Sequence, residues 1–341
     1  MLILGIESSC DETAIAVVKN GKQVLSSQIA SQTLLHEQWG GVIPEIAARE
    51  HLAALKFMYE EALRESSTDI KSIDAIAVTQ GPGLVGCLLV GVSFAKGLAL
   101  AVRKPLIPIN HVHAHVHGAL LGVDQSNEEL FPTLALVVSG GHTNLYYLNS
   151  PLEFELLAHT MDDACGESFD KVGKMLGLPY PGGPHVEALA RKGLASKVNL
   201  PTMMERKSQM AFSYSGLKTA VSLAIKHPKA NVQPEDIAAA FQEEALGQLI
   251  RKLIEAIRLK PKAKSILIAG GVAANQRFRE LMALKIKLPS LFPPLQYCSD
   301  NGAMIAAMGY YEATAKPPSS ELNWDVYSRY PFERYKATNH P

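Results

Sequence analysis

The sequence is poor in cysteine and contains no paired cysteine motif. Its 341 residues include 4 cysteines, which are far apart and never form a CxxC pattern: Cys10, Cys87, Cys165 and Cys298. This scarcity argues against a disulfide framework or a structural zinc site built from cysteines, and it fits a reducing compartment. The sequence also lacks net charge, with 33 basic and 33 acidic residues. We therefore expect no overall electrostatic attraction to nucleic acid.

Targeting and membrane signals are missing as well. The first residues, Met1–Gly5, lead directly into a predicted strand, with no basic segment and no cleavable apolar segment. The most apolar stretch, Leu84–Val102, is interrupted by Lys96 and by glycines, so we predict a buried helix instead of a membrane span. The HExxH signature of zinc proteases is also absent. We expect a cytoplasmic protein that does not associate with a membrane.

Basic residues are abundant in one segment despite the zero net charge. Within Arg251–Lys287 they far outnumber acidic residues. Such a segment either forms a face that contacts phosphate backbone or belongs to an ordinary solvated helix and loop. The sequence leaves both interpretations open.

Two patterns of secondary structure occur twice, in the same order. The first pattern is a strand, a polar turn and a second strand, at Leu2–Val18 and again at Thr133–Leu148. The second is a strand, a glycine-rich turn and a helix, at Ile73–Val102 and again from Ser265 onward. The recurrence predicts an internal duplication, with two α/β halves facing a cleft lined by the turns.

The predicted domain boundaries follow from this duplication. An N-terminal lobe would comprise residues 1–108 together with about 302–330, and a C-terminal lobe would comprise residues 109–301. The second lobe would include a helical insertion at about 162–234, and residues 331–341 would form a tail.

Four histidines within seven residues are the most informative motif. In a helix, His111 and His115 lie one turn apart on one face, as do His113 and His117, and either pair could share a metal ion. The alternative is a histidine-rich helix end without metal. If Asp300 joined His111 and His115, two histidines and one carboxylate would suit Fe²⁺ and, less exclusively, Zn²⁺. Asp300 would equally suit the N-cap of the following helix.

The polar turns suggest binding and proton transfer. Glycines after strands, at Ser139–Gly141 and Gly270–Gly271, allow backbone N–H groups to approach a phosphate, although such turns also occur without ligands. Asn275 could hold a ribose or a base. Asp11 and Glu12 could bind a cation or act as a base, or they could form an exposed acidic turn.

Several of these motifs together resemble the TsaD (Gcp, Kae) family, over residues 2 to about 332. The matching segments are Gly5–Thr13, Gly40–Glu45, Gly81–Leu84, His111 with His115, Ser139–Thr143, Phe212–Lys218, Gly270–Asn275 and Asp300–Ala303. The Gly40–Arg49 stretch is similar to the bacterial and mitochondrial branch.

The resemblance implies a fold and a reaction. The fold would be a duplicated actin-like ATPase fold of the sugar kinase, Hsp70 and actin (ASKHA) class, with two lobes around a nucleotide cleft. The reaction would transfer the threonylcarbamoyl group from threonylcarbamoyl-AMP to N6 of the adenosine 3′ of the anticodon, in tRNAs that read ANN codons, and would release AMP.

The resemblance also implies site residues by position. The metal ligands would be His111, His115 and Asp300, and the catalytic carboxylates would be Asp11 and Glu12. The substrate and nucleotide contacts would lie on several turns: Val137, Val138, Ser139, Gly140, Gly141, Asp170, Gly183, Glu187 and Asn275.

The implied cofactors are one Fe²⁺, with Zn²⁺ as the alternative metal, and a bound nucleotide, either threonylcarbamoyl-AMP or ATP/ADP with Mg²⁺. The implied partners are tRNA, a threonylcarbamoyl-AMP synthase, a TsaB-like paralogue similar to the first half of this chain, and a TsaE-like small ATPase. Two alternatives remain: an O-carbamoyltransferase that acts on a small molecule, which would carry an extra activating domain, and an ASKHA-fold kinase or nucleotide-gated assembly protein, which would not need the histidine pair.

Overall fold

The chain divides into two compact units in a computed structural model that describes residues 1–205, 209–227, 229–316 and 321–329. The first unit contains Met1–Gln32, Ile43–His117 and the residues from Asp300 onward, and the second contains Thr33–Val42 and Gly118–Ser299. The tail predicted at residues 331–341 lies outside the described residues.

The first unit is built on a five-stranded sheet in the order β3-β2-β1-β4-β5. Central strand β1 pairs antiparallel with β2 and parallel with β4. The strands are β1 (Leu2–Glu7), β2 (Glu12–Lys19), β3 (Gln23–Ser31), β4 (Ala75–Gly81) and β5 (Leu106–Asn110). Residues 3–7 of β1 are all buried, which is typical of a strand covered on both faces.

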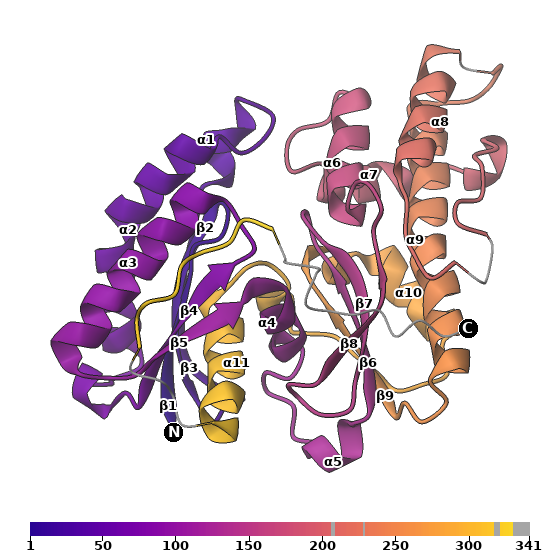
Figure 1. The fold of residues 1–341 in the computed structure, drawn as a ribbon. Coiled ribbons are helices and arrows are strands. Elements are labelled where there is room, and N and C mark those ends of the chain that lie inside the picture. The colour runs from indigo at the N-terminus through magenta and orange to yellow at the C-terminus, as the bar shows by residue number, and fades with distance from the viewer. Residues whose placement is uncertain (206–208, 228, 317–320, 330–341) are drawn as a thin grey trace. The chain divides into compact units, whose positions relative to one another are not determined.

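Helices cover this sheet on its two faces. Helices α2 (Pro44–Glu65) and α3 (Val85–Val102) pack together on one face, and α11 (Gly302–Ala315) lies on the other (Figure 1). Leu4 and Ile6 belong to the core cluster under α2 and α3. A side chain at Gly5 would collide with the Gly302 carbonyl oxygen, so glycine permits the close approach of α11.

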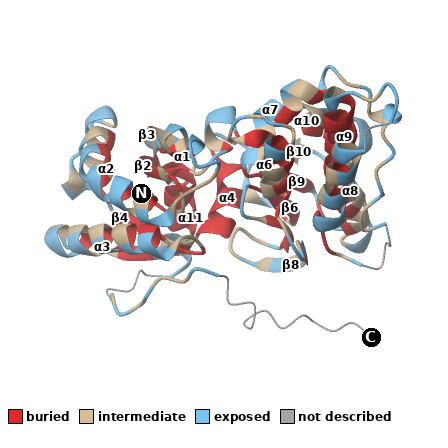
Figure 2. Ribbon diagram, turned by 90° about the horizontal axis from the view of Figure 1, so that it is seen from above, coloured by how far each residue is buried: buried red, intermediate tan, exposed pale blue. Residues whose placement is uncertain are grey.

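Helix α3 is only partly buried, in contrast to the prediction from its apolar sequence. Among the described residues, it is the one helix whose length and composition would allow a membrane span, and 33% of it is buried. Core helices of soluble proteins share this property, so it is weak evidence for a membrane. The buried face includes Leu88 and Val92, whereas Val85, Leu89 and Leu100 are exposed. Figure 2 shows exposed surface along the outer sides of α2 and α3.

The second unit repeats the strand order of the first. Its sheet has the order β10-β9-β6-β7-β8, with β6 antiparallel to β7 and parallel to β9. The strands are β6 (Thr133–Val138), β7 (Thr143–Leu148), β8 (Phe154–His159), β9 (Ser265–Ala269) and β10 (Ser290–Leu291). Since β6 to β10 follow the pairing of β1 to β5, the predicted duplication is confirmed.

The second unit also holds most of the remaining helices. Residues 162–234 contain several of them. The helices of this unit are α1 (Thr33–Glu37), α5 (Asn127–Leu130), α6 (Cys165–Met175), α7 (Gly182–Ala190), α8 (Ser215–Lys226), α9 (Pro234–Leu259) and α10 (Gln276–Lys285). Short 3₁₀ turns occur in this unit at η2 (Ala195–Lys197), η3 (Gly271–Ala274) and η4 (Leu295–Tyr297), and in the first unit at η1 (Ile70–Ser72).

Helix α4 (His111–Gly118) groups almost entirely with the first unit, as does Asp300. The sequence interpretation had placed residues 109–301 in the second lobe. The grouping has a local cause, because α4 follows β5 directly and the ring of His117 packs 5.1 Å from that of Tyr311 on α11. All residues proposed as metal ligands therefore belong to one compact unit.

Candidate functional site

The histidine motif forms helix α4 immediately after strand β5. Asn110, the last residue of β5, accepts a hydrogen bond from the His113 backbone N–H through Oδ1 (2.9 Å), so it starts the helix at this point. His111 and His115 then lie one turn apart, with ring centroids 4.8 Å apart. The helical spacing predicted from the sequence is confirmed.

Asp300 brings a carboxylate to this pair. Its Oδ1 lies 3.1 Å from Nε2 of His115 and 3.7 Å from Nε2 of His111. Candidate ligand atoms of the three residues all lie within 4.8 Å of one another. The two histidines are buried and Asp300 is partly buried. Two imidazole nitrogens and one carboxylate that face one another fit Fe²⁺ or Zn²⁺.

Asp300 does not cap the following helix, contrary to the alternative interpretation of the sequence. The N-cap of α11 is Asn301, whose Oδ1 accepts the Met304 backbone N–H at 2.8 Å. This one-residue offset lets the Asp300 carboxylate face the histidines while its neighbour satisfies the helix end.

The other two histidines of α4 have different surroundings. His113 and His117 are buried, and His117 Nδ1 lies 3.1 Å from the His113 carbonyl oxygen. Burial, with the nearby His117, lowers the pKa of His113 to about 3, so its ring is neutral. Among the described residues, the group that could hold a metal comprises His111, His115 and Asp300 and excludes this second pair.

Glu7, at the end of β1, is a residue that the sequence reasoning missed. Its side chain is fully buried, and Oε2 lies 3.0 Å from Nδ1 of His111. Burial raises the pKa of Glu7, but the charge and hydrogen bond of His111 outweigh this effect and hold that pKa below its usual value. A carboxylate at the end of an otherwise apolar strand was the available signal.

The pKa of His111 is shifted upwards, in contrast to that of Glu7. Burial lowers its pKa, whereas the carboxylates of Glu7 and Asp300 raise it, with a net increase to about 9. Binding of a metal at Nε2 would require release of the proton that this pKa favours, so metal affinity would depend on pH.

The turn after β1 places Asp11 and Glu12 in the same unit. Asp11 is buried, and its carbonyl oxygen accepts the Gln32 backbone N–H at 3.0 Å. Glu12 is partly buried, with Oε1 3.4 Å from the Ser31 hydroxyl. The interpretation as an exposed acidic turn is therefore wrong. Burial, together with the charges of Asp300 and Asp11, raises the pKa of Glu12 to about 10.

His51 of α2 anchors this turn. Its Nε2 lies 2.9 Å from the Cys10 carbonyl oxygen, and its Nδ1 lies 2.7 Å from the Thr13 hydroxyl. Burial lowers the pKa of His51, which favours the neutral ring. The neutral tautomer that donates from Nε2 to Cys10 and accepts at Nδ1 from Thr13 satisfies both contacts.

In the second unit, the predicted glycine turns lie at one edge of the sheet. Strands β6 and β9 are parallel neighbours, so the turns that follow Val138 and Ala269 emerge at the same end. A Cβ atom at Gly270, which has φ +88°, would come within 2.4 Å of the Val138 carbonyl oxygen. Val137 and Val138 are fully buried, so a ligand would contact them through the main chain.

Other glycines at this edge are not explained by contacts within the protein. A Cβ atom would meet nothing within 4 Å at any of them, and none has positive φ: Gly140, Gly141, Gly183 and Gly271. Ser139 closes its own turn, since its N–H donates to the His142 carbonyl oxygen at 2.8 Å. The open space beside these glycines fits the close approach of a phosphate to backbone N–H groups.

The remaining predicted contact residues have structural partners. Asp170 Oδ1 accepts the Gly182 N–H at 2.8 Å, and Glu187 Oε1 accepts the Gln276 N–H at 3.0 Å. Asn275 caps α10 through Phe278 N–H, and its Nδ2 donates to Gln242. These contacts join α6, α7 and α10 at the glycine edge, and binding roles for the three side chains stay predictions.

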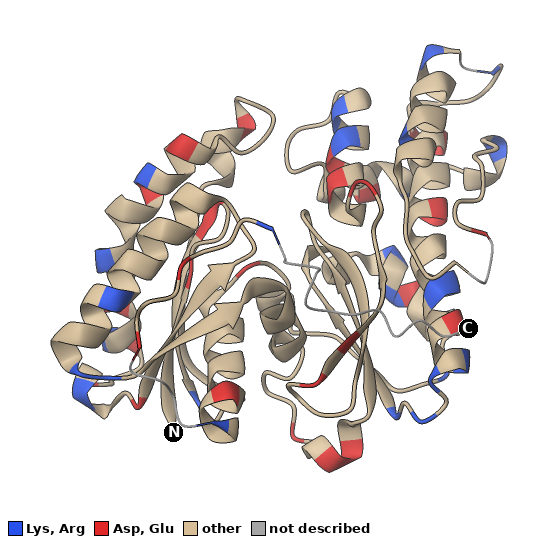
Figure 3. Cartoon of the chain, viewed as in Figure 1, with Lys and Arg blue, Asp and Glu red and all other residues tan. Residues whose placement is uncertain are grey.

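Several basic side chains of the segment Arg251–Lys287 have acidic partners in the described structure. Arg251 pairs with Glu244, and Arg277 pairs with Glu243 and Glu280. The Lys252 side chain is buried and donates to a backbone carbonyl. Figure 3 shows acidic residues interspersed with basic ones on α9 and α10. These pairs favour the solvated-helix interpretation for α9 and the first turn of α10. For the other lysines of the segment, both interpretations stay open.

Comparisons with known proteins give one consistent description for the relatives of this chain. A family model described as "tRNA N6-adenosine threonylcarbamoyltransferase" matches residues 23–307. The protein of that name from Anoxybacillus flavithermus is 47% identical over 316 residues, covering 91% of each chain. Its counterpart from Protochlamydia amoebophila is 44% identical and covers 98% of this chain and 100% of its own.

Solved structures show similarity of fold. Full-length HypF in its phosphate- and nucleotide-bound form has a TM-score of 0.63 at 13% identity, covering 93% of this chain and 47% of that one. The activator of 2-hydroxyisocaproyl-CoA dehydratase from Clostridium difficile, with bound ADPNP, has a TM-score of 0.53 at 14% identity, covering 92% and 96%. The predicted ASKHA fold is confirmed.

Proposed function

Because the chain belongs to the family of tRNA N6-adenosine threonylcarbamoyltransferases, we propose that its first unit carries the groups that act on the reacting atoms. The activity is the formation of N6-threonylcarbamoyladenosine in tRNA. The observation that carries the proposal is the placement of His111, His115, Asp300 and the Asp11–Glu12 turn in one compact unit.

The donor we propose is threonylcarbamoyl-AMP, and the acceptor is the adenosine 3′ of the anticodon in tRNAs that read ANN codons. N6 of adenosine attacks the carbamoyl carbon, the bond from that carbon to the phosphate oxygen breaks, and AMP leaves. Fe²⁺, or Zn²⁺ in its place, would be held by His111, His115 and Asp300 and would supply Lewis-acid chemistry.

Glu12 is the residue we assign to proton transfer. The exocyclic amine of adenine is a poor nucleophile, so its proton must be removed as the new bond forms. With its pKa near 10, the Glu12 carboxyl is protonated at neutral pH and cannot accept that proton. Burial is the largest cause of the raised pKa of Glu12, followed by the charges of Asp300 and Asp11. A cation held by His111, His115 and Asp300 would oppose the part of the shift that comes from Asp300 and would so favour the carboxylate form that a base requires. Asp11 adds a second carboxylate to the same turn.

The glycine edge of the second unit is the proposed binding place for the adenylate part of the donor, or for ATP/ADP with Mg²⁺. Support comes from the open backbone at Gly140, Gly141 and Gly183. Ser139 and the main chain of Val137 and Val138 border the same turn. Asp170, Glu187 and Asn275 would contribute by holding α6, α7 and α10 in place around it.

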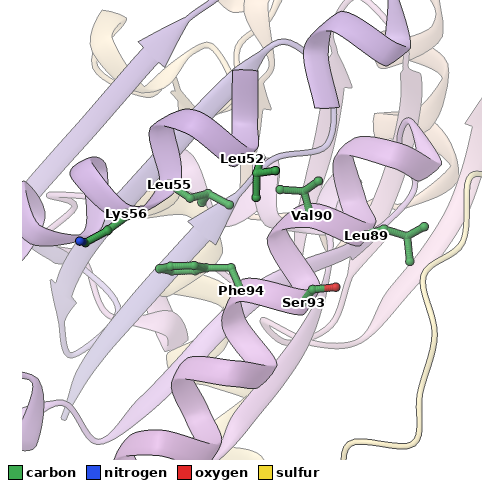
Figure 4. A pocket seen from close by; sticks show the side chains of 7 residues that line it. All are labelled: Leu52, Leu55, Lys56, Leu89, Val90, Ser93 and Phe94. Atoms are coloured by element: carbon green, nitrogen blue, oxygen red, sulfur yellow. The ribbon is translucent and has the colours of Figure 1, made fainter. Parts of the chain in front are cut away.

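An apolar groove lies on the surface of the first unit. Helices α2 and α3 enclose a groove of about 470 Å³, and its lining is mostly apolar: Leu52, Leu55, Lys56, Leu89, Val90, Ser93 and Phe94 (Figure 4). Leu52 is 72% exposed and Leu89 is 44% exposed, which is unfavourable for a surface that stays in water. We propose that the TsaB-like paralogue binds here, because a chain similar to this unit would present an equivalent apolar helix pair.

The test of the proposed activity is mass analysis of nucleosides from tRNA. The full chain would be incubated with tRNA and threonylcarbamoyl-AMP, in the presence of the paralogue and the TsaE-like ATPase. We expect N6-threonylcarbamoyladenosine at the position 3′ of the anticodon in ANN-reading tRNAs and none with His111→Ala. A small-molecule carbamoyl product with unmodified tRNA would contradict the proposal and favour the O-carbamoyltransferase alternative.

A further inference from the structure

We propose that Glu7 is a positioning residue for the candidate metal site, because its carboxylate accepts the Nδ1–H of His111 and fixes the ring with Nε2 towards Asp300. This inference rests on the metal site of the proposed function and names a residue outside its ligand group. Neither the histidine motif nor the family resemblance assigned a role to Glu7.

The contacts of Glu7 show that it acts as an acceptor. Oε2 receives the Thr79 hydroxyl at 2.6 Å and lies 3.0 Å from His111 Nδ1, while Oε1 receives the Ser9 backbone N–H. The Ser9 N–H can only donate, so Oε1 of Glu7 must be an acceptor. The side chain is fully buried, and these groups replace the water that it would otherwise bind.

Glu7 contacts the imidazole nitrogen of His111 that faces away from Asp300, so it can orient this metal-ligand candidate without binding the metal itself. Oε2 contacts Nδ1, whereas the Asp300 carboxylate faces Nε2 across the same ring. A neutral imidazole carries its proton on one nitrogen only, so a proton held at Nδ1 leaves the Nε2 lone pair available. A carboxylate at the distal nitrogen of a ligand histidine also fixes ring orientation and increases ligand basicity.

The elements that carry this contact are hydrogen-bonded neighbours in one sheet or follow such a strand directly. Glu7 ends the central strand β1, Thr79 lies on the neighbouring strand β4, and His111 opens α4 directly after β5. Ser9 Oγ lies 3.2 Å from the same Nδ1, so the hydroxyl is a weaker, uncharged neighbour of the proton. Three paired strands thus determine the orientation of one ring.

The test compares metal binding by full-length variants that share the same fold. Glu7→Gln has the same shape but no charge. Its amide NH₂ is itself a donor, so it cannot accept a hydrogen bond from the donor group that it faces. Thr79→Val is the matched control, since it removes a hydrogen bond to the same oxygen and leaves the contact of Glu7 with His111. Each protein would be stripped with a chelator and reloaded with Co²⁺ or Zn²⁺. The readouts are the Kd from competition with a chromophoric chelator and the visible absorption spectrum of bound Co²⁺.

We expect Glu7→Gln to weaken metal binding by about 10–100-fold and to shift the Co²⁺ bands, as is usual when the partner of a ligand histidine is removed. Thr79→Val should change the Kd by only a few fold and keep the wild-type spectrum. If Glu7→Gln does not fold, Glu7→Asp replaces it, because the shorter side chain keeps the charge but moves it away from Nδ1 of His111. We expect this variant to bind metal more weakly as well. Circular dichroism melting of each metal-free variant separates loss of folding from loss of the contact.

Two results would overturn the assignment, and they are distinguishable. If wild-type protein binds Co²⁺ and Glu7→Gln binds it with the same Kd and spectrum, Glu7 does not position His111 and the metal site stands. If wild-type protein and His111→Ala both fail to bind Co²⁺ or Zn²⁺, the metal site of the proposed function is wrong and the role of Glu7 falls with it.

Discussion

At the scale of single residues, the two histidine pairs of α4 differ in what faces them. His111 and His115 face the Asp300 carboxylate, whereas His113 and His117 are buried near each other, and His117 packs against Tyr311. We therefore expect His111→Ala or His115→Ala to abolish bound metal, and His113→Ala to retain most of it. Elemental analysis of the purified proteins measures this difference. Equal losses in all three variants would contradict the ligand assignment.

Glu12 offers a test of the proposed proton transfer. Glu12→Ala removes a carboxyl group from the first unit and leaves the glycine edge of the second unit unchanged. Nucleotide affinity, measured by calorimetry, should stay near wild type, while single-turnover transfer should slow by about 10²-fold or more, in the range of a lost general base. Transfer at a near-normal rate would remove Glu12 from the chemistry.

The raised pKa of Glu12 also predicts how pH affects stability. In the metal-free folded protein this pKa is about 10, against 4.5 for the ordinary carboxyl group. Between these values the folded state holds a proton that the unfolded state has released, so this group makes the free energy of unfolding fall as pH rises. Glu12→Gln removes the effect. The variant should melt above the wild type at pH 8 and lose this advantage near pH 4.

Thermal melts of both metal-free proteins at the two pH values provide the measurement. A difference in melting temperature that stays constant from pH 4 to pH 8 would show that Glu12 titrates normally.

Residue-level features were the hardest to predict from the sequence. The helical spacing of His111 and His115 was readable, because it is local. From the sequence, Asp300 suited a metal ligand and a helix cap equally well, and only the identity of the cap of α11, Asn301, decides between them. Glu7 was missed because its partners Thr79 and His111 are 72 and 104 residues away. The pairing of Arg277 with Glu243 likewise depends on packing between α9 and α10.

At the scale of elements, strands were predictable where their residues are buried on both faces. Strands β1 and β6 are almost entirely buried, and their apolar residues, each followed by a polar turn, predicted them. Helix α3 was misjudged because its apolar residues suggest complete burial, whereas one side of the helix is exposed. The composition of a helix indicates how strongly its residues favour burial, but it does not reveal which face of the helix packs against the rest of the protein.

The exposed side of α2 and α3 leads to a prediction about the paralogue. Leu52→Glu and Leu89→Glu place charges in the groove between the helices and should weaken binding of the TsaB-like partner by at least about tenfold, because a buried unpaired charge is costly. Leu284→Glu is the matched control, since Leu284 is also 72% exposed but belongs to α10 of the second unit.

Isothermal titration of each purified variant with the paralogue measures these affinities. Thermal stability should stay near wild type in all three, since the replaced side chains are already largely exposed. Weakening by the control to the same extent would show that the groove is not the binding surface.

At the scale of the whole molecule, the duplication allows each of the two units to carry a different group of candidate functional residues. The two sheets share a strand order, yet the first unit carries the histidine and carboxylate group and the second carries the open glycines. The sequence predicted the repeated strand order because the pattern of strands and turns is local. The membership of α4 and Asp300 in the first unit was not predictable, because it depends on contacts with β1 and α11.

The same division leads to the last prediction, which is dependence on other proteins. Both compact units are copies of one ASKHA-type lobe, and the described residues contain no third unit that would activate threonine. The net charge of the chain is zero, and Arg251 and Arg277 of the basic segment are paired with glutamates, although affinity for tRNA usually depends on neutralisation of phosphates. Partners would therefore supply both the activated donor and part of the tRNA-binding surface.

We expect the isolated protein to leave tRNA unmodified when it is given threonine, bicarbonate and ATP. Addition of the threonylcarbamoyl-AMP synthase, the paralogue and the small ATPase should restore modification. Mass analysis of tRNA nucleosides distinguishes the two conditions, with His111→Ala as the inactive control in the complete mixture. Multiple turnovers by the isolated protein from free threonine would disprove the dependence, because the chain would then have to contain an activation site of its own.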